Sequence, residues 1–174
     1  AFSFGLQWVA IIWVFLDGVT IAITTIVGQY IGAKKIEWIN QILNKGLIIG
    51  TLVVLPFSLL SVFFGEYGIL LFSSDLEVVK IGTIYLIITM SLMIFDVLLI
   101  VYTAAFNGAG DTKPPMIISF VSNWIFKILF AYITTYVLKL NSTWVWIAIS
   151  LSFITEGLGL WIWFKKGKWK EKIV

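Results

Sequence analysis

Long apolar runs alternate with short polar segments along the whole 174-residue chain. The runs cover roughly residues 4–30, 46–64, 81–107, 116–137 and 144–164. Each is close to or above the roughly 20 residues that cross a bilayer core as a helix. Because lipid offers no hydrogen-bond partners to the backbone, these runs should be helices. The pattern predicts an all-α integral membrane protein with five transmembrane helices in a single membrane domain.

The polar segments between the runs indicate how the spans are connected. In residues 36–45, IEWINQILNK, the apolar residues recur at helical spacing, which favours a short helix lying in the membrane interface. Pro56 falls within the second run, where it removes one backbone donor and predicts a kink. The segment GAGDTKPP, residues 108–115, marks a sharp helix end between the third and fourth runs.

Composition excludes most other classes of protein. The chain is 60% apolar, has a mean hydropathy of +1.04 and is only 12% charged. It contains neither cysteine nor histidine, so it lacks thiolate nucleophiles, disulfides and the commonest general base and metal ligand. No Ser/Lys pair has a catalytic spacing. We therefore expect no enzyme activity and no cofactor, and the net charge of +3 does not indicate nucleic-acid binding.

The lysines predict an orientation. Those at one set of helix ends are Lys34, Lys35, Lys45, Lys113, Lys165, Lys166, Lys168, Lys170 and Lys172, whereas the other set has only Lys80 and Lys139. By the positive-inside rule the first set is cytoplasmic, together with the C-terminus. Five spans then place Ala1 outside the cell membrane.

Tryptophans gather near both ends of the spans. Because amphipathic rings prefer membrane interfaces, we interpret them as belts that serve anchoring and packing rather than ligand stacking. They are Trp8, Trp13, Trp144 and Trp146 on the outer side and Trp161, Trp163 and Trp169 on the inner side.

Four charged residues lie within the spans, where they should face the protein interior and pair with one another. Asp96 lies about 17 Å from the inner end of its span, near the midplane, and Lys127 lies at a similar height. Glu156 and Asp17 lie somewhat below and above that level. One interpretation is a structural ion pair between Lys127 and either Asp96 or Glu156. The other is a cation or proton site, which we favour for Asp96 and consider for Asp17.

Several segments together resemble the multidrug and toxic compound extrusion (MATE) family. They are TIVGQYIGAKK from Thr25, FSSDLEVVKIGTIYL from Phe72, AFNGAGDTKPPMIIS from Ala105, WIFKILFAY from Trp124 and WFKKGKWKEKIV from Trp163. The resemblance covers nearly the whole chain. It implies twelve spans in two six-helix halves, of which these five are similar to spans eight to twelve.

The resemblance also implies roles for individual residues. Asp96 lies twelve residues before Gly108, at the position of a carboxylate that contributes to the cation site of sodium-coupled members, so it is a candidate Na⁺ ligand. A second carboxylate of that site lies on the seventh span. Another branch of the family places its essential aspartates in the N-terminal half. Leu129 stands where the family pattern usually has proline.

These observations predict the C-terminal half of a plasma-membrane antiporter that exports drugs or organic cations in exchange for Na⁺ or H⁺. Ala1 lies within an apolar run, without methionine or a signal peptide, so we expect a longer protein whose N-terminal half is the partner of this chain. Membrane lipids and an amphipathic or cationic substrate are the other expected partners. The alternatives are a flippase for lipid or polysaccharide precursors, and a structural membrane subunit without transport activity.

Overall fold

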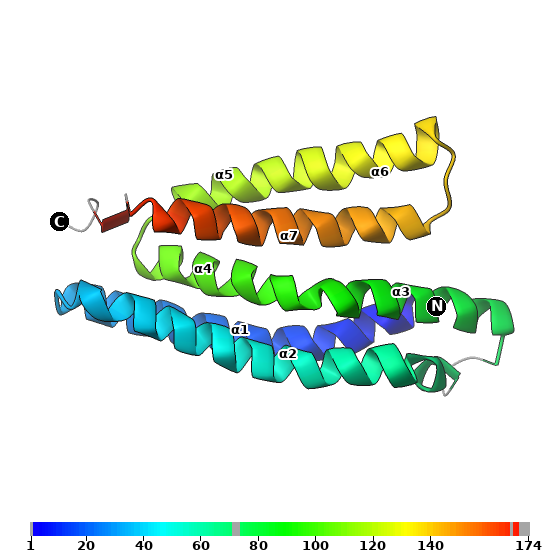
Figure 1. Ribbon diagram of the computed structural model, residues 1–174, viewed down its shortest axis with the longest axis horizontal. Helices are drawn as coiled ribbons and strands as arrows, with labels where there is room; N and C mark the ends of the chain where they lie inside the picture. The colour runs from blue at the N-terminus through cyan, green and yellow to red at the C-terminus, as the bar shows by residue number, and fades with distance from the viewer. Residues whose placement is uncertain (1, 71–73, 168, 171–174) are drawn as a thin grey trace.

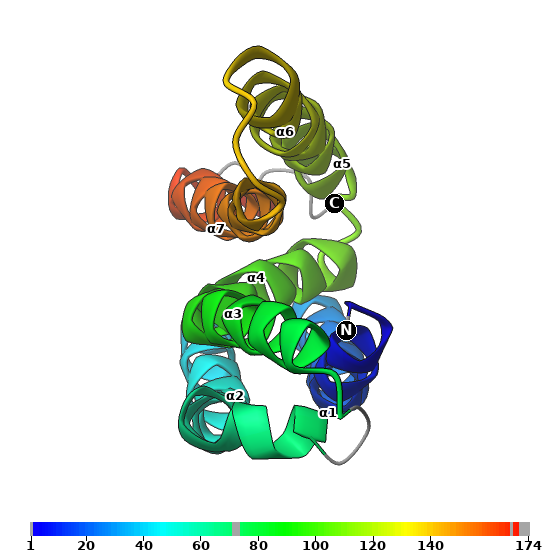
Figure 2. The same ribbon diagram turned by 90° about the vertical axis from the view of Figure 1, so that its right-hand side faces the viewer.

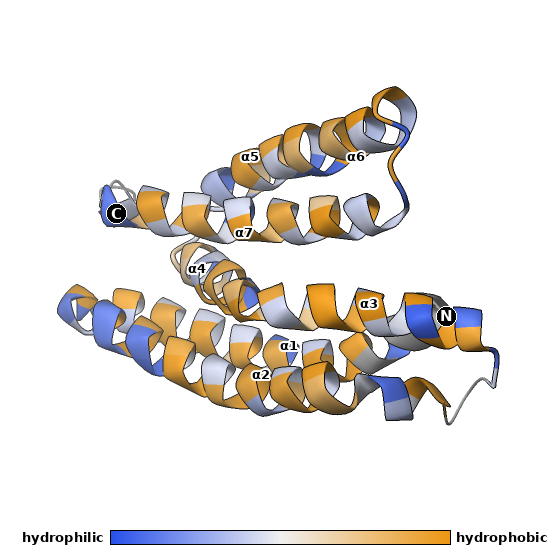
Figure 3. Ribbon diagram, turned by 45° about the vertical axis from the view of Figure 1, so that its right-hand side comes forward, coloured by the Kyte–Doolittle hydropathy of each residue, from blue (hydrophilic) through white to orange (hydrophobic). Residues whose placement is uncertain are grey.

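The computed structural model describes residues 2–70, 74–167 and 169–170, and within these ranges the regular secondary structure is helical. Five helical segments are long and apolar enough to cross a membrane: Val9–Gly32, Ile36–Leu70, Leu76–Gly108, Lys113–Val137 and Thr143–Lys165. Hydrophobic residues cover the lengths of the helices and hydrophilic residues collect toward their ends (Figure 3). The predicted all-α membrane fold is confirmed.

The first two spans differ from the prediction in one respect. The helix α1 covers Phe2–Gly32, and a short 3₁₀ turn, η1 at Ile36–Trp38, leads directly into α2 at Ile39–Leu70. The separate interfacial helix predicted for residues 36–45 is therefore wrong. Its apolar residues Ile39 and Leu43 are buried inside the bundle, so they are the inner face of the second span itself. Pro56 lies within α2.

The third span changes helix type at its centre. It consists of α3 at Leu76–Leu92, a 3₁₀ turn η2 at Met93–Phe95 and α4 at Asp96–Gly108. Asp75 caps α3 by accepting a 2.9 Å hydrogen bond from the backbone N–H of Glu77. The 3₁₀ turn was not expected, since neither glycine nor proline is present in it.

The fourth span is a continuous helical rod with an unusual hydrogen-bond pattern. Its elements are α5 at Lys113–Val121, the π-helix η3 at Ser122–Leu129, α6 at Phe130–Tyr132 and a second π-helical stretch, η4, at Ile133–Val137. Leu129 is the last residue of the first π-helical stretch. The fifth span is α7 at Thr143–Lys165.

The helices form two groups joined through α4 and α7. The helices α1, α2, α3 and α4 pack together, α7 lies against α4, and the fourth span packs on α7 (Figures 1 and 2). Gly108 makes the contact between α1 and α4 close, because a Cβ atom there would lie 2.6 Å from the carbonyl oxygen of Thr24. The two motifs GQYIGAKK and GAGDTKPP thus begin where these helices touch.

The lysine-rich connections lie at one end of the bundle. The α1–α2 connection, the α4–α5 connection and the C-terminal end of α7 share that end, while the α6–α7 loop lies at the other (Figure 1). This arrangement agrees with five antiparallel crossings. Which end faces the cytoplasm stays a prediction.

Candidate functional site

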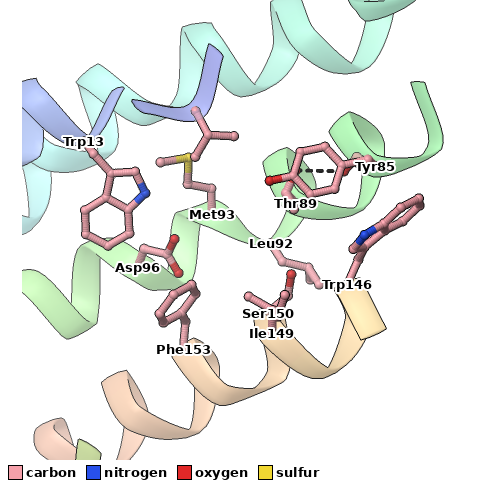
Figure 4. A pocket seen from close by; sticks show the side chains of 11 residues that line it. Trp13, Tyr85, Thr89, Leu92, Met93, Asp96, Trp146, Ile149, Ser150 and Phe153 are labelled. Carbon is pink, nitrogen blue, oxygen red and sulfur yellow. Dashed lines mark hydrogen bonds between the residues drawn. The ribbon is translucent and has the colours of Figure 1, made fainter. Parts of the chain in front are cut away.

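A cavity of about 220 Å³ surrounds Asp96 near the middle of the third span (Figure 4). Its walls come from three parts of the fold. Val9 and Trp13 belong to α1; Tyr85, Thr89, Leu92, Met93 and Asp96 belong to the third span; Trp146, Ile149, Ser150 and Phe153 belong to α7. Residues far apart in sequence therefore enclose one carboxylate.

Two aromatic contacts tie α7 to the opposite walls of this cavity. Trp13 and Phe153 have ring centroids 6.1 Å apart and join α1 to α7. Tyr85 and Trp146 meet edge to face at 5.4 Å and join α3 to α7. The faces of aromatic rings carry negative charge density and attract cations when water is excluded. The aromatic walls and the carboxylate thus favour the same kind of ligand.

The carboxylate of Asp96 is buried, with 7% of the residue exposed. Among the side chains that the structure describes, none forms an ion pair or a hydrogen bond with it. An isolated charge in such surroundings is expensive unless a proton or a cation neutralises it. Asp96 therefore has the environment expected of a residue that binds and releases a cation.

Asp96 follows the change of helix type in the third span. The 3₁₀ turn Met93–Phe95 immediately precedes it, and a 3₁₀ stretch inside a helix often marks a functional hinge.

The hydroxyl of Thr89 donates a 2.7 Å hydrogen bond to the carbonyl oxygen of Tyr85, within the same wall of the cavity (Figure 4). This intrahelical bond holds the Thr89 oxygen at the cavity.

Oxygen atoms are the ligands that a hard cation requires. Within the described ranges, no three His, Cys, Asp or Glu side chains gather into a metal-binding group. A cation beside Asp96 would therefore take neutral oxygens as its other ligands, and the hydroxyls of Thr89 and Ser150 line the same cavity. The donor set fits a monovalent cation or a proton better than a divalent metal.

The structure does not bring Asp17 into this cavity. Asp17 lies on an exposed part of α1, next to Leu16, which is fully buried. The coupling role considered for Asp17 stays a prediction, and it would involve a different surface from that of Asp96.

Lys127 and Glu156 lie between the fourth span and α7. Glu156 is 7% exposed, accepts a hydrogen bond from the Ser119 side chain and interacts electrostatically with Lys127. Of the two partners considered for Lys127, the structure thus places Glu156 beside it. A weak contact of 3.4 Å between the hydroxyls of Thr155 and Ser122 joins the same two helices.

The aromatic residues of the cavity were missed by sequence reasoning. Trp146 was interpreted as part of the outer belt, serving anchoring and packing; it packs on Tyr85, is 8% exposed and lines the cavity, which the belt interpretation did not predict. Trp13 also lines the cavity. The spacing of Trp146, Ser150 and Phe153, at steps of four and three residues along one helix, was the available signal.

Comparisons with known proteins point to one family. The model of the family described as MatE matches residues 1–133. A "Probable multidrug resistance protein NorM" of Thermotoga maritima is 28% identical over 157 residues, which are 90% of this chain and 34% of that protein. A protein of the same name from Buchnera aphidicola subsp. Baizongia pistaciae is 27% identical over 75% of the chain and 30% of its own length. "Multidrug and toxin extrusion protein 1" of Xenopus tropicalis is 31% identical over 71% and 21%.

The chain spans about a third or less of the length of these curated relatives.

Proposed function

Because this chain belongs to the MatE family, we propose that it forms part of a membrane transporter that exports drugs or organic cations by antiport with Na⁺ or H⁺. The names of the relatives, which refer to multidrug resistance and toxin extrusion, support this class of substrate. The observation that carries the proposal is the Asp96 carboxylate, buried without a described partner in an aromatic cavity.

In the proposed mechanism Asp96 binds the coupling ion. With Na⁺ or a proton on Asp96 the carboxylate charge is neutralised, so the cavity attracts a cationic substrate much less strongly, through its aromatic walls alone. When the ion leaves, the carboxylate and the ring faces of Trp13 and Phe153 attract an organic cation. Ion and substrate then exclude each other through a single charge, which is the requirement for exchange.

We propose that the whole transporter contains a second half, with substrate held between the two near the midplane. The five spans would correspond to spans eight to twelve, and the protein would lie in the plasma membrane. The buried carboxylate favours this function over a structural membrane subunit, since an uncompensated intramembrane charge is costly and usually retained for ion or substrate handling.

The test uses the full-length protein reconstituted in liposomes with a fluorescent organic cation such as ethidium. A Na⁺ gradient and a pH gradient are imposed separately, which distinguishes the coupling ions. We expect Asp96→Asn to reduce gradient-driven transport at least tenfold. The exposed Glu66→Gln makes the same chemical change outside the cavity and should leave transport unaltered. Asp17→Asn tests the second candidate in the same assay.

Full ion-driven transport by Asp96→Asn under both gradients would remove the coupling role from this residue.

The proposed orientation has its own test, since the chain is free of cysteine. Single cysteines at Lys34 and Lys80 should react with a membrane-impermeant maleimide from the cytoplasmic and the outer side, respectively. The reverse pattern would contradict the predicted topology.

A further inference from the structure

A second cavity, of about 470 Å³, lies at the lysine-rich end of the bundle. Its polar lining comes from three spans: Asn40 and Asn44 on α2, Tyr102 on α4, Lys165 on α7, and Trp169 and Lys170 just beyond α7. This cavity is separate from the one around Asp96, and nothing in the proposed transport mechanism uses it.

The lining of this cavity suits an anion. Asn40 and Asn44 are four residues apart and lie on the same face of α2. The lysines add two positive charges, and the described residues that line the cavity include no Asp or Glu. Ammonium and amide N–H groups are hydrogen-bond donors, so an anion with several oxygen atoms could be bound from two sides.

An aromatic cluster holds Trp169, the neighbour of Lys170, against the bundle. The Trp169 ring stacks on Phe164 with centroids 4.8 Å apart, and its indole N–H donates a 3.2 Å hydrogen bond to the carbonyl oxygen of Phe164. Phe164 in turn packs on Tyr102 and Phe106 of α4. Trp169 is 3% exposed. Trp169 and the adjacent Lys170 thus lie beside the cavity.

The two lysines lie against aromatic rings as well. The Lys165 Nζ atom is 4.0 Å from the centre of the Trp161 ring, and the Lys170 Nζ atom is 5.7 Å from that of Trp169. Cation–π contacts of this kind restrict the lysine side chains without neutralising them. Both charges remain available to a ligand.

The position of the cavity in the fold indicates where the ligand comes from. It lies at the ends of helices long and apolar enough to cross a membrane, which is where lipid phosphates would meet water, and clustered lysines attract anionic headgroups there. We propose that this cavity binds a phosphate group, supplied by the headgroup of an anionic phospholipid. The bound headgroup joins α2 to α7 across α4, which lies between them (Figure 2).

The experiment measures ligand binding to the purified full-length protein in detergent, by native mass spectrometry. Phosphatidylglycerol, phosphatidylcholine and inorganic phosphate are the three probes. The test variant is Lys165→Gln/Lys170→Gln. The matched control is Lys34→Gln/Lys35→Gln, which removes two lysines from the same end of the bundle but outside the cavity. A second variant, Asn40→Ala/Asn44→Ala, removes donors while keeping the charge.

We expect the affinity for phosphatidylglycerol to fall about tenfold or more in Lys165→Gln/Lys170→Gln, since each lysine near a membrane surface contributes roughly a factor of five. The affinity for phosphatidylglycerol should also fall in Asn40→Ala/Asn44→Ala, and it should be unchanged in the control variant. Phosphatidylcholine should bind more weakly. If inorganic phosphate binds with similar affinity and is lost in the same variants, the site takes free phosphate.

The proposal is overturned if Lys165→Gln/Lys170→Gln and the control Lys34→Gln/Lys35→Gln bind phosphatidylglycerol with the same affinity. This holds whether both keep the affinity of the unaltered protein or both lose it to the same extent. Unchanged melting temperatures without added lipid show that the variants are folded.

Discussion

The Ser58 hydroxyl on α2 donates a 2.9 Å hydrogen bond to the carbonyl oxygen of Met90 on α3. The same oxygen accepts the backbone N–H of Met93, at the start of the 3₁₀ turn that leads to Asp96. Ser58 does not line the cavity around Asp96. It nevertheless holds the backbone at the point where the third span changes helix type, so the position of Asp96 depends on a neighbouring helix.

We predict that Ser58→Ala destabilises the protein by about 1 kcal/mol, the usual contribution of one hydrogen bond. It should also reduce ion-driven transport, because the turn before Asp96 loses a fixed contact. Thermal unfolding and liposome transport of the full-length variant measure the two effects.

The control for this prediction is Ser152→Ala. Ser152 is also a buried serine, but its hydroxyl bonds to the carbonyl oxygen of Ile149 within its own helix. We expect it to affect stability less and transport very little. Equal losses of transport in both variants would contradict a specific role of the Ser58–Met90 contact.

The five spans, and the presence of a carboxylate at Asp96 inside the third, could be predicted because each depends on local sequence. Apolar length identifies a span, and one carboxylate within it stands out against its neighbours. The 3₁₀ turn at Met93–Phe95 could not be predicted, since its residues are ordinary helix formers and the turn coincides with contacts from α2 and α7. The same limit applies to residues 36–45, where apolar spacing cannot distinguish a helix facing lipid headgroups from one facing a bundle.

The aromatic cavity illustrates a further limit. Trp144 and Trp146 are two residues apart at the same end of one span, yet one is 37% exposed and the other 8%. The residue type is the same and the two positions differ by only about 3 Å along the helix, whereas Trp146 alone packs edge to face on Tyr85. Which tryptophan belongs to the site is a property of the assembled helices.

This pair supplies a matched prediction. Trp146→Ala removes the edge-to-face contact with Tyr85 and enlarges the cavity, and we expect a loss of stability of about 3 kcal/mol, as for other buried aromatic truncations. Binding of an organic cation should weaken as well. Trp144→Ala should cost much less in both measurements. Melting curves and fluorescence titration with ethidium compare the two; similar effects would show that Trp146 is only an interface anchor.

The approach of α7 to α4 beside Asp96 supports another prediction. A Cβ atom at Gly157 would lie 3.0 Å from the backbone nitrogen of Leu99 and 3.1 Å from the carbonyl oxygen of Phe95. Backbone atoms cannot rotate away, so Gly157→Ala should separate the two helices and cost about 1–3 kcal/mol.

Gly68 is the control for Gly157, because a Cβ atom there has no neighbour within 4 Å. Gly68→Ala should be neutral or slightly stabilising, since alanine favours the helical state. Thermal unfolding of the two variants gives the comparison. If Gly157→Ala is as stable as the unaltered protein, then α7 can move away from α4 without loss of folding free energy.

The electrostatic interaction between Lys127 and Glu156 predicts non-additive changes in stability. Lys127→Met leaves Glu156 buried without its positive neighbour, although the hydrogen bond from Ser119 remains. Removing a positive neighbour costs more when the buried carboxylate is still charged than when it has already been neutralised. We therefore expect Lys127→Met/Glu156→Gln to be more stable than the sum of the single changes indicates, with a coupling of about 1 kcal/mol. A double-mutant cycle on thermal unfolding measures this coupling. The control pair is Lys139→Met with Glu156→Gln, whose effects should be additive because Lys139 lies beyond the far end of the fourth span. A coupling near zero for the first pair would mean that the fourth span is held on α7 by apolar packing rather than by these charges.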